Sequence, residues 1–146
     1  MPVLINGNDG KWINEHGKAI EASKGDHQTL IVQLRLAAGR ATHSVATVDA
    51  VAENGDFYVA DGSSTRIVPF VASENVIVVI GANKLVKNEE EAKERQTAYI
   101  FGLESARVRK AYGWPSALLS NAITVSTSSA TPGRIHFVIV KEKLGF

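Results

Sequence analysis

The sequence predicts one α/β domain, and three features of its hydropathy pattern support that prediction. The apolar run in "NVIVVIGAN" has the length and β-branched composition of a strand covered on both faces. The stretch "KNEEEAKERQTAYIFGLESARVRKAYG" has the pattern of a long helix, and "NAITVSTSS" and "GRIHFVIVKEKLGF" follow it as two strand-like runs. This alternation, together with one hairpin, is typical of a mixed sheet with helices packed on it.

Length and composition exclude several classes of protein. The chain has 146 residues, about one domain's worth, and its 16 basic and 15 acidic residues give no positive surface for nucleic acid or an anionic membrane. It contains no cysteine, which excludes disulfides, thiolate metal sites and iron-sulfur ligation by this chain. The four histidines lack metal-type spacing, so we expect no metal and no cofactor. Because no spanning segment or signal peptide is recognisable, we expect a cytoplasmic protein.

The N-terminal part divides into two regions of different character. Residues 1–27 combine a short apolar run, the turn cluster "NGNDG" and a polar stretch, so we expect a loosely ordered segment there. From Asp26 onward, apolar residues recur every three or four positions, which predicts a helix over "DHQTLIVQLRLAAGRA". Asp26 or Thr29 is available as its N-cap.

A hairpin and two helix starts are predicted downstream. The sequence "ENGD" separates two β-rich runs, so we place strands near 48–53 and 56–60, with positive φ at both Asn54 and Gly55. A short helix is expected to begin at 62–64, with Pro69 limiting its length. The long helix is expected to begin after Asn88 as N-cap and to be interrupted at Gly102.

The run "DGSSTR" allows a structural and a chemical interpretation. Its backbone N–H groups and hydroxyls would suit a phosphate or carboxylate at a helix start, with Arg66 adding charge-assisted hydrogen bonds. A plain helix cap explains the same residues, and spacing alone favours the cap. The ligand-binding candidates here are Gly62, Ser63, Ser64, Thr65 and Arg66.

Two further residues are candidates for catalysis. Glu53, at the end of a predicted strand, could act as a general base or nucleophile, or be an ordinary solvated hairpin residue. Lys84, directly after the buried-type strand in "GANK", occupies the carboxyl end of a strand, where α/β proteins bind ligands, although a solvated loop lysine is equally compatible.

Several segments together resemble a known family. The run "AVAENG", the "DGSSTR" turn, "VVIGANKLV" and the terminal "LGF" occur in the order typical of the LUD domain, the lactate-utilisation family of the LutC/YkgG type. The resemblance covers residues 42–146, whereas residues 1–27 match nothing recognisable. It implies a fold like that of the NagB/RpiA/CoA-transferase group: a mostly parallel sheet with helices on both faces, here with a truncated N-terminal part.

The resemblance also implies a site and partners. Carried over by position, the site residues are Glu53 and Gly55, Gly62 and Arg66, and Asn83 and Lys84. The family belongs to bacterial L-lactate oxidation, where it stands beside iron-sulfur proteins, so such subunits and a small anionic metabolite are the expected partners. Many relatives carry a cysteine-bearing segment before the last strands, which "YIFGLESARVRKAYGWPSALLSN" replaces here. A shortened sheet could leave an open edge that homo-oligomerisation covers.

Three functions remain open from the sequence. The first is an accessory subunit of lactate or related organic-acid oxidation that binds a small anionic or phosphorylated ligand. The second is an independent isomerase or transferase in which Glu53 is base or nucleophile and Lys84 stabilises developing negative charge. The third is a structural or regulatory domain without catalysis. We favour the first, because no complete set of general acid, base and orienting residue is visible.

Overall fold

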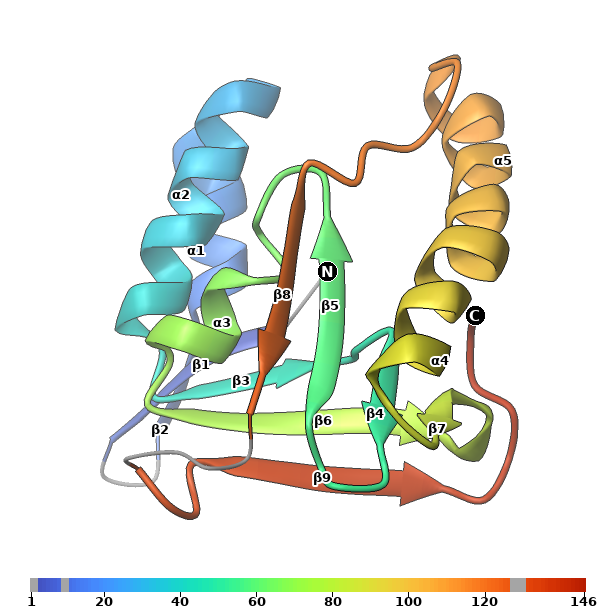
Figure 1. Ribbon diagram of the computed structural model, residues 1–146. Helices are drawn as coiled ribbons and strands as arrows, with labels where there is room; N and C mark the ends of the chain where they lie inside the picture. Colours follow the sequence, from blue (N-terminus) through green and yellow to red (C-terminus); the bar gives the residue numbers. More distant parts are fainter. Residues whose placement is uncertain (1–2, 9–10, 127–130) are drawn as a thin grey trace. The chain divides into compact units, whose positions relative to one another are not determined.

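The computed structural model describes residues 3–8, 11–126 and 131–146 (Figure 1). Helices and strands alternate along the chain, and the predicted α/β class is confirmed. The chain divides into two compact units, each assembled from three segments. The first comprises residues 1–47, 63–79 and 130–138, and the second comprises 48–62, 80–129 and 139–146.

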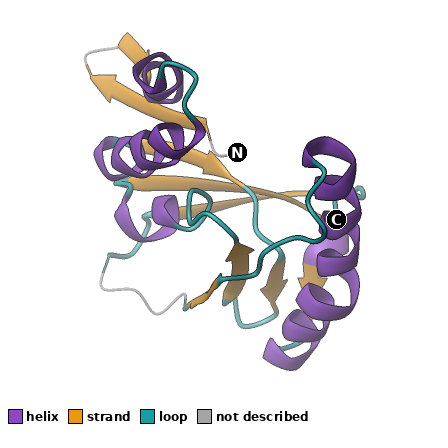
Figure 2. Ribbon diagram, turned by 90° about the horizontal axis from the view of Figure 1, so that it is seen from above, coloured by secondary structure: helices purple, strands orange, loops and turns teal. Residues whose placement is uncertain are grey.

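The first unit opens with a hairpin and a helix. Strand β1 (Val3–Asn8) pairs antiparallel with β2 (Lys11–Asn14), and helix α1 (Glu15–Ser23) follows directly (Figure 2). Asn14 caps the helix, because its Oδ1 accepts the N–H of Gly17 at 2.9 Å. Over the described residues 3–8 and 11–27, the expectation of a loosely ordered segment was therefore wrong. Pairing of β1 with a strand about 40 positions later in the sequence (Val3↔Val45) and packing of α1 on α2 supply order that no local pattern indicates.

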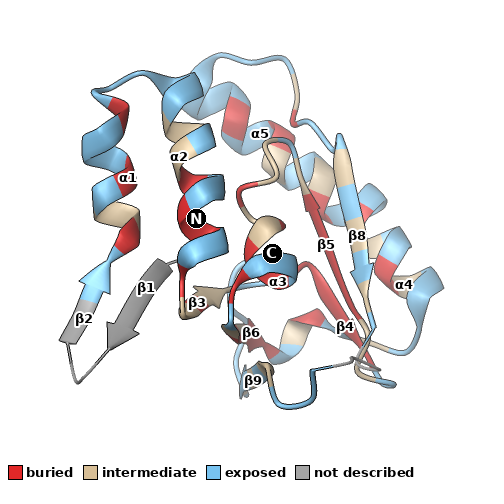
Figure 3. Cartoon of the chain, turned by 90° about the vertical axis from the view of Figure 1, so that its left-hand side faces the viewer, coloured by how far each residue is buried: buried red, intermediate tan, exposed pale blue. Residues whose placement is uncertain are grey.

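Helix α2 (His27–Arg40) confirms the predicted helix and its cap. Asp26 Oδ2 accepts the N–H of Thr29 at 2.7 Å. The buried face of α2 joins α1 in an apolar core (Figure 3). Small side chains allow the two helices to approach closely; the members of this core are Ala19, Leu34, Ala37, Ala38 and Ala41.

Sheet A has the strand order β2-β1-β3-β6-β9. Strand β3 (His43–Ala46) pairs parallel with β6 (Asn75–Gly81). Strand β9 (Ile135–Val140) is the edge beside β6, and the bonds Val76 N–H to Arg134 O and Ala82 N–H to Glu142 O advance together along both strands, as in a parallel pair. The predicted strand in "NVIVVIGAN" is confirmed, but only alternate side chains are fully buried, so one face is covered completely and the other partly.

Sheet B belongs to the second unit and has the order β7-β4-β5-β8. Strands β4 (Ala50–Ala52) and β5 (Phe57–Asp61) form the predicted hairpin, and β8 (Asn121–Val125) pairs antiparallel with β5. The short β7 (Leu85–Val86), preceded by a 3-10 turn η1 (Ala82–Lys84), pairs parallel with β4. The predicted strand "NAITVSTSS" extends into 127–129, which lie outside the described residues.

The hairpin turn has a different geometry from the one expected. The N–H of Gly55 donates to the carbonyl of Ala52 at 2.9 Å, and only Gly55, with φ of 89°, has a positive φ. Asn54 keeps a negative φ because its Oδ1 accepts the N–H of Asp56 and its Nδ2 donates to that carboxylate. The turn is a three-residue loop with a glycine bulge instead of a two-residue Asn-Gly turn.

The predicted long helix forms, with a wider turn in its middle. It runs through α4 (Glu89–Glu94), the π-helical segment η2 (Arg95–Ile100) and α5 (Phe101–Tyr112). Asn88 is its N-cap, as expected, accepting the N–H of Glu91 at 3.0 Å. Gly102 lies inside α5 and does not interrupt it, which corrects that expectation; one glycine costs only about 1 kcal/mol in a helix whose flanking turns are intact.

Candidate functional site

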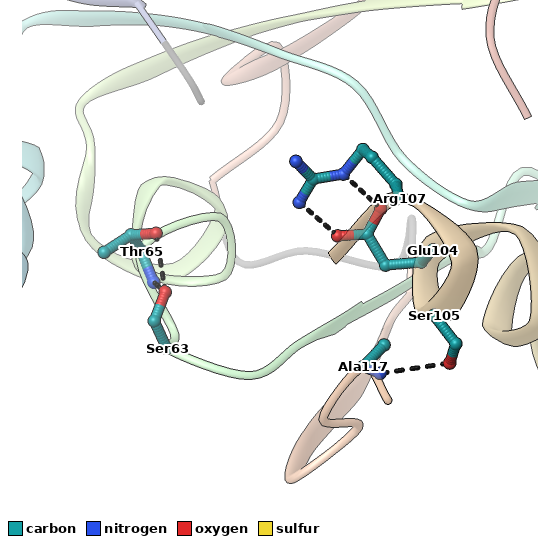
Figure 4. A network of polar contacts seen from close by, with 6 residues as sticks. All are labelled: Ser63, Thr65, Glu104, Ser105, Arg107 and Ala117. Atoms are coloured by element: carbon teal, nitrogen blue, oxygen red, sulfur yellow. Dashed lines mark hydrogen bonds and ion pairs between the residues drawn. The ribbon is translucent and has the colours of Figure 1, made fainter. Parts of the chain in front are cut away.

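The "DGSSTR" turn is held by hydrogen bonds within itself. Ser63 Oγ lies 2.9 Å from Thr65 Oγ1 and accepts the N–H of Thr65 at 3.4 Å (Figure 4). Ser64 has a φ of 64°, and its carbonyl accepts the N–H groups of Ile67 and Val68 at 3.1 and 3.0 Å. These are the contacts of a serine/threonine turn, in which the side-chain oxygen replaces a backbone partner.

This turn does not begin a helix. The short helix α3 (Val68–Ala72) starts further on, and its N-cap Ile67 makes no side-chain cap hydrogen bond. The expected start at 62–64 was wrong, because the left-handed conformation of Ser64 turns the chain away from a helical path. Pro69 lies in the first turn of α3, where its missing N–H is harmless, and does not end the helix. Because no helix begins at residues 62–64, there is no helix dipole at this position to support an anion site.

Two arginines bring positive charge to the same unit. Arg35, on α2, donates from Nε to the carbonyl of Ser63 at 2.8 Å, and Arg66 is half-buried. The candidates Ser63, Ser64, Thr65 and Arg66 all belong to the first unit, and their ligand-binding role remains a prediction.

The remaining predicted residues belong to the second unit, where Gly62 has a packing role. A Cβ on Gly62 would lie 3.1 Å from both the Cβ and the carbonyl oxygen of Leu118. Ser120 Oγ donates to the Gly62 carbonyl at 3.0 Å. Close approach of the segment before β8 therefore accounts for a glycine at this position.

Asn83 and Lys84 contact different parts of the chain. Asn83 joins the loop after β6 to the C-terminal segment: its Oδ1 accepts the N–H of Leu144 at 3.1 Å and its Nδ2 donates to the Gly145 carbonyl at 3.3 Å. Lys84 is only 4% exposed, and its Nζ donates to the Val48 carbonyl at 3.0 Å. A buried ammonium carries a large desolvation cost, so Lys84 is not the solvated loop residue that the sequence also allowed.

The strand register separates Glu53 from Lys84. Val51 pairs with Leu85 and Ala52 with Val86, so Glu53 and Lys84 are three positions apart along two parallel strands. At roughly 3.3 Å per residue this is about 10 Å. Glu53 is exposed beyond the end of β4, whereas the Lys84 ammonium lies near Val48, before β4 begins. Gly55 closes the turn beside Glu53, and none of these contacts brings the carboxylate to the ammonium.

A buried polar cluster surrounds the start of β4, and the sequence reading missed most of it. Asp49 is 3% exposed; its Oδ2 accepts the backbone N–H of Ala60 at 2.7 Å and the Nε2 of Gln96 at 3.1 Å. Arg95 Nε donates to the Asp49 carbonyl at 2.9 Å, next to the Val48 carbonyl that binds Lys84. We call Asp49, Lys84, Arg95 and Gln96 the Asp49 cluster.

One signal in the sequence could have indicated this cluster. Ala92, Gln96 and Ile100 recur at four-residue spacing and are all buried, so an amide occupies one position of an otherwise apolar helix stripe. Such a polar residue needs a buried partner. That partner, Asp49, lies 47 residues away in sequence, and no local pattern identifies it.

Arg95 is held in an unusual way. It opens the π-helical segment η2, a type of turn often found at functional sites. Its guanidinium carbon lies 5.1 Å from the centre of the Tyr99 ring. Within the residues that the structure describes, its Nη2 is buried and has no hydrogen-bond partner, which costs about 1–3 kcal/mol for such a donor.

Two pKa shifts concern Tyr58 on β5 and Lys93 on α4. Burial raises the pKa of the Tyr58 hydroxyl, and the nearby negative charge of Glu89 adds to this effect. A hydrogen bond to Glu89 raises the pKa of Lys93, and the corresponding ion pair measures 2.8 Å. A shallow surface depression here is lined by Asn88, Glu89, Glu90 and Lys93, and by none of the predicted site residues.

The fold and the Asp49 cluster define an α/β protein in which two charged side chains, Asp49 and Lys84, are buried beside the start of β4. The sequence model of the LUD domain matches residues 13–140, and the chain therefore belongs to the LUD domain family, which is associated with lactate utilisation. The match begins well before residue 42, so it includes part of the segment for which no resemblance was recognised. Comparison with curated proteins and with solved structures gave no match.

Two further observations concern the described residues. Within residues 3–8, 11–126 and 131–146, no helix combines the length and apolar character needed to cross a bilayer. Over the same ranges, His, Asp and Glu side chains nowhere gather in threes as ligands for a metal ion.

Proposed function

We propose that the protein is an accessory subunit of bacterial organic-acid utilisation, with L-lactate as the expected substrate of the system, and that it binds a small anionic ligand. Membership of the LUD family supports the association with lactate utilisation. The observation that carries the ligand-binding part is the buried Lys84 ammonium in the second unit. An ammonium group can donate three hydrogen bonds, and a carboxylate or phosphate oxygen is a strong acceptor for them.

The redox step belongs to partner subunits in this proposal. The chain contains no cysteine with which to bind an iron-sulfur cluster. An exposed apolar set begins at the last residue of α5 and continues after the helix, where many relatives carry their cysteine-bearing segment; its members are Tyr112, Trp114, Leu118 and Leu119. Exposed aromatic and leucine side chains of this kind are enriched where proteins dock, so this set is the proposed contact with an iron-sulfur subunit.

Thermal unfolding with added ligands tests the binding. L-lactate, pyruvate, sugar phosphates, acyl-CoAs and flavins are each titrated, because a ligand that binds only the folded state raises its stability with concentration. We expect a rise in Tm that Lys84→Met abolishes and that Lys87→Met, at an exposed lysine, preserves. Arg66→Ala distinguishes a site in the first unit from one in the second: loss of the Tm shift in that variant places the anion at the "DGSSTR" turn. No shift with any ligand at millimolar concentration contradicts the proposal.

Mixing purified proteins tests the docking. The chain is combined with the purified iron-sulfur subunits of an L-lactate oxidation system, and the complex is measured by size-exclusion chromatography with light scattering. Trp114→Ser with Leu118→Ser should weaken the complex, whereas Val71→Ser, at an exposed apolar residue of the first unit, should leave it unchanged. The same measurement on the chain alone reports whether it forms a homo-oligomer. Equal binding by all variants contradicts the proposed surface.

The alternative enzyme would use Glu53 and Lys84 on one substrate. Their separation of about 10 Å along the sheet requires a substrate that spans the distance, such as a sugar phosphate. Turnover by the isolated chain that Glu53→Gln abolishes would favour this alternative over the accessory role.

A further inference from the structure

We infer that the exposed side of the long helix is a contact between two copies of this chain, which pair antiparallel with their two-fold axis close to Gly102. The inference concerns the second unit alone and does not depend on the ligand or on the iron-sulfur contact proposed above. It places homo-oligomerisation on a helix, whereas the sequence suggested an open sheet edge.

The water-facing side of this helix is apolar in its middle. The stretch "QTAYIFGL", residues 96–103, contains no charged residue. Ile100 is buried, as expected for the side that packs on the protein, but Tyr99 and Leu103 are 38% and 40% exposed. A surface helix normally presents charged and polar side chains to water. Exposed apolar side chains at successive turns therefore indicate a face that another protein covers.

A row of exposed residues runs beside Tyr99 and Leu103 and recurs at every fourth position. We call it the Glu94 row; its members are Glu94, Ala98, Gly102, Ala106 and Lys110. An uninterrupted α-helix would rotate such a row by about 40° at each step. The wider π-helical turns of η2 rotate it in the opposite sense, so the row stays closer to one side of the helix.

The charges of the Glu94 row identify the second copy as the partner. Gly102 is the midpoint of the row, with Glu94 eight positions before it and Lys110 eight positions after it. Two antiparallel copies that meet at Gly102 therefore place each Glu94 opposite Lys110 of the other copy, and both pairs attract. A parallel pair would place like charges opposite each other. Among the described residues, neither side chain takes part in an ion pair within its own chain.

The middle of the row permits close approach of the two helices. Ala98 and Ala106 carry only a methyl group, and a Cβ on Gly102 would meet nothing within 4 Å, so Tyr99 and Leu103 can reach the partner helix. The neighbouring Arg107 is already held by Glu104 at 2.8 Å. The row is about 25 Å long at 1.5 Å per residue, which gives a contact at the small end of protein interfaces. We therefore expect a reversible dimer that forms at high protein concentration.

The test is analytical ultracentrifugation of the full chain from about 1 μM to about 1 mM, over which the mass should rise from one chain to two. Glu94→Lys and Lys110→Glu should each raise the dimer dissociation constant at least about tenfold, because each turns both ion pairs into repulsions. Glu21→Lys, at an exposed carboxylate on α1, is the matched control and should leave the constant unchanged. Circular dichroism at low concentration establishes that each variant is folded.

Two further samples test the geometry. An equimolar mixture of Glu94→Lys and Lys110→Glu restores opposite charges at both contacts, so the mixed pair should associate more tightly than either variant alone. Ala98→Gln with Ala106→Gln keeps the charge of the row but holds the helices apart, and should also weaken the dimer. Both substitutions lie on the exposed side of a helix, where glutamine is well tolerated.

The results that overturn the inference are distinct. A wild type that remains a single chain at every concentration excludes the dimer, and a dimer that neither charge reversal weakens uses another surface. A mixture that associates no better than its components excludes the antiparallel pairing. If Glu94→Lys instead abolishes binding of the iron-sulfur subunits and the wild type alone stays monomeric, the face belongs to that partner. None of these outcomes changes the ligand-binding proposal, which the Tm measurement tests separately.

Discussion

A methyl group added at Gly81 should detach the C-terminal segment from the loop after β6. A Cβ at this position would lie 2.4 Å from Asn83 Oδ1, 2.4 Å from the Leu144 backbone nitrogen and 2.6 Å from the Glu142 carbonyl oxygen. Gly81 has a φ of −80°, which alanine adopts readily, so the effect of Gly81→Ala is steric and not conformational. Two of the three atoms are backbone and cannot rotate away.

The size of the effect follows from these contacts. Overpacking of a buried site costs about 1–3 kcal/mol. Displacement of the segment also breaks the bond between Leu144 N–H and Asn83 Oδ1 and the bond between Ala82 N–H and the Glu142 carbonyl, at about 1 kcal/mol each. We therefore expect Gly81→Ala to lower the free energy of unfolding by about 2–5 kcal/mol.

Gly102→Ala is the matched control. It adds the same methyl group to the same unit, at the second residue of α5, where a Cβ would meet nothing within 4 Å. Because alanine is the better helix former, this variant should gain about 0.5–1 kcal/mol. Urea unfolding followed by circular dichroism measures both values, and hydrogen exchange at the Leu144 amide reports the segment itself. A loss below about 0.5 kcal/mol in Gly81→Ala, with unchanged exchange at Leu144, refutes the steric argument.

Three further predictions concern single polar groups. Ser105→Ala removes the acceptor of the buried Ala117 N–H, now bonded at 3.0 Å (Figure 4), and should cost about 1–3 kcal/mol in urea unfolding; no loss would mean that water replaces the hydroxyl. Hydrogen bonds from Thr29 are the main cause of the lowered pKa of Asp26 in the folded protein. The loss of unfolding free energy in Asp26→Ala should therefore be complete above the unfolded-state pKa of 3.8 and should vanish as the pH falls through the lower folded-state pKa. A loss that persists in acid contradicts the cap. The raised pKa of Tyr58 gives the opposite sign: its contribution is complete below the unfolded value of 10.0 and is lost as the pH rises through the folded value, so absorbance titration should show a late-titrating tyrosine that disappears in Tyr58→Phe.

Features with local causes could be predicted from the sequence. Asp26 and Asn88 cap their helices through N–H groups three residues further on, at 2.7 and 3.0 Å, and any chain that passes through these residues can form such bonds. The hairpin follows in the same way from Gly55, because glycine accepts a positive φ at little cost. Even here the local rule has limits: the hydrogen bonds of the Asn54 side chain changed the turn type, and Ser64 adopted a left-handed conformation that moved the start of α3.

The candidate site, in contrast, depended on the tertiary structure. Lys84 was recognised from its place after a strand, but its burial and its bond to Val48, 36 residues away, were not readable from the chain. The sequence pattern does not single out Asp49 or Arg95, because an isolated aspartate before a strand and an arginine in a charged helix are common residues. Only their contact in the folded structure distinguishes them. Their contact spans 46 positions and forms only when sheet and helix pack, because the cost of burying polar groups is offset by partners that the fold, and not the neighbouring sequence, provides.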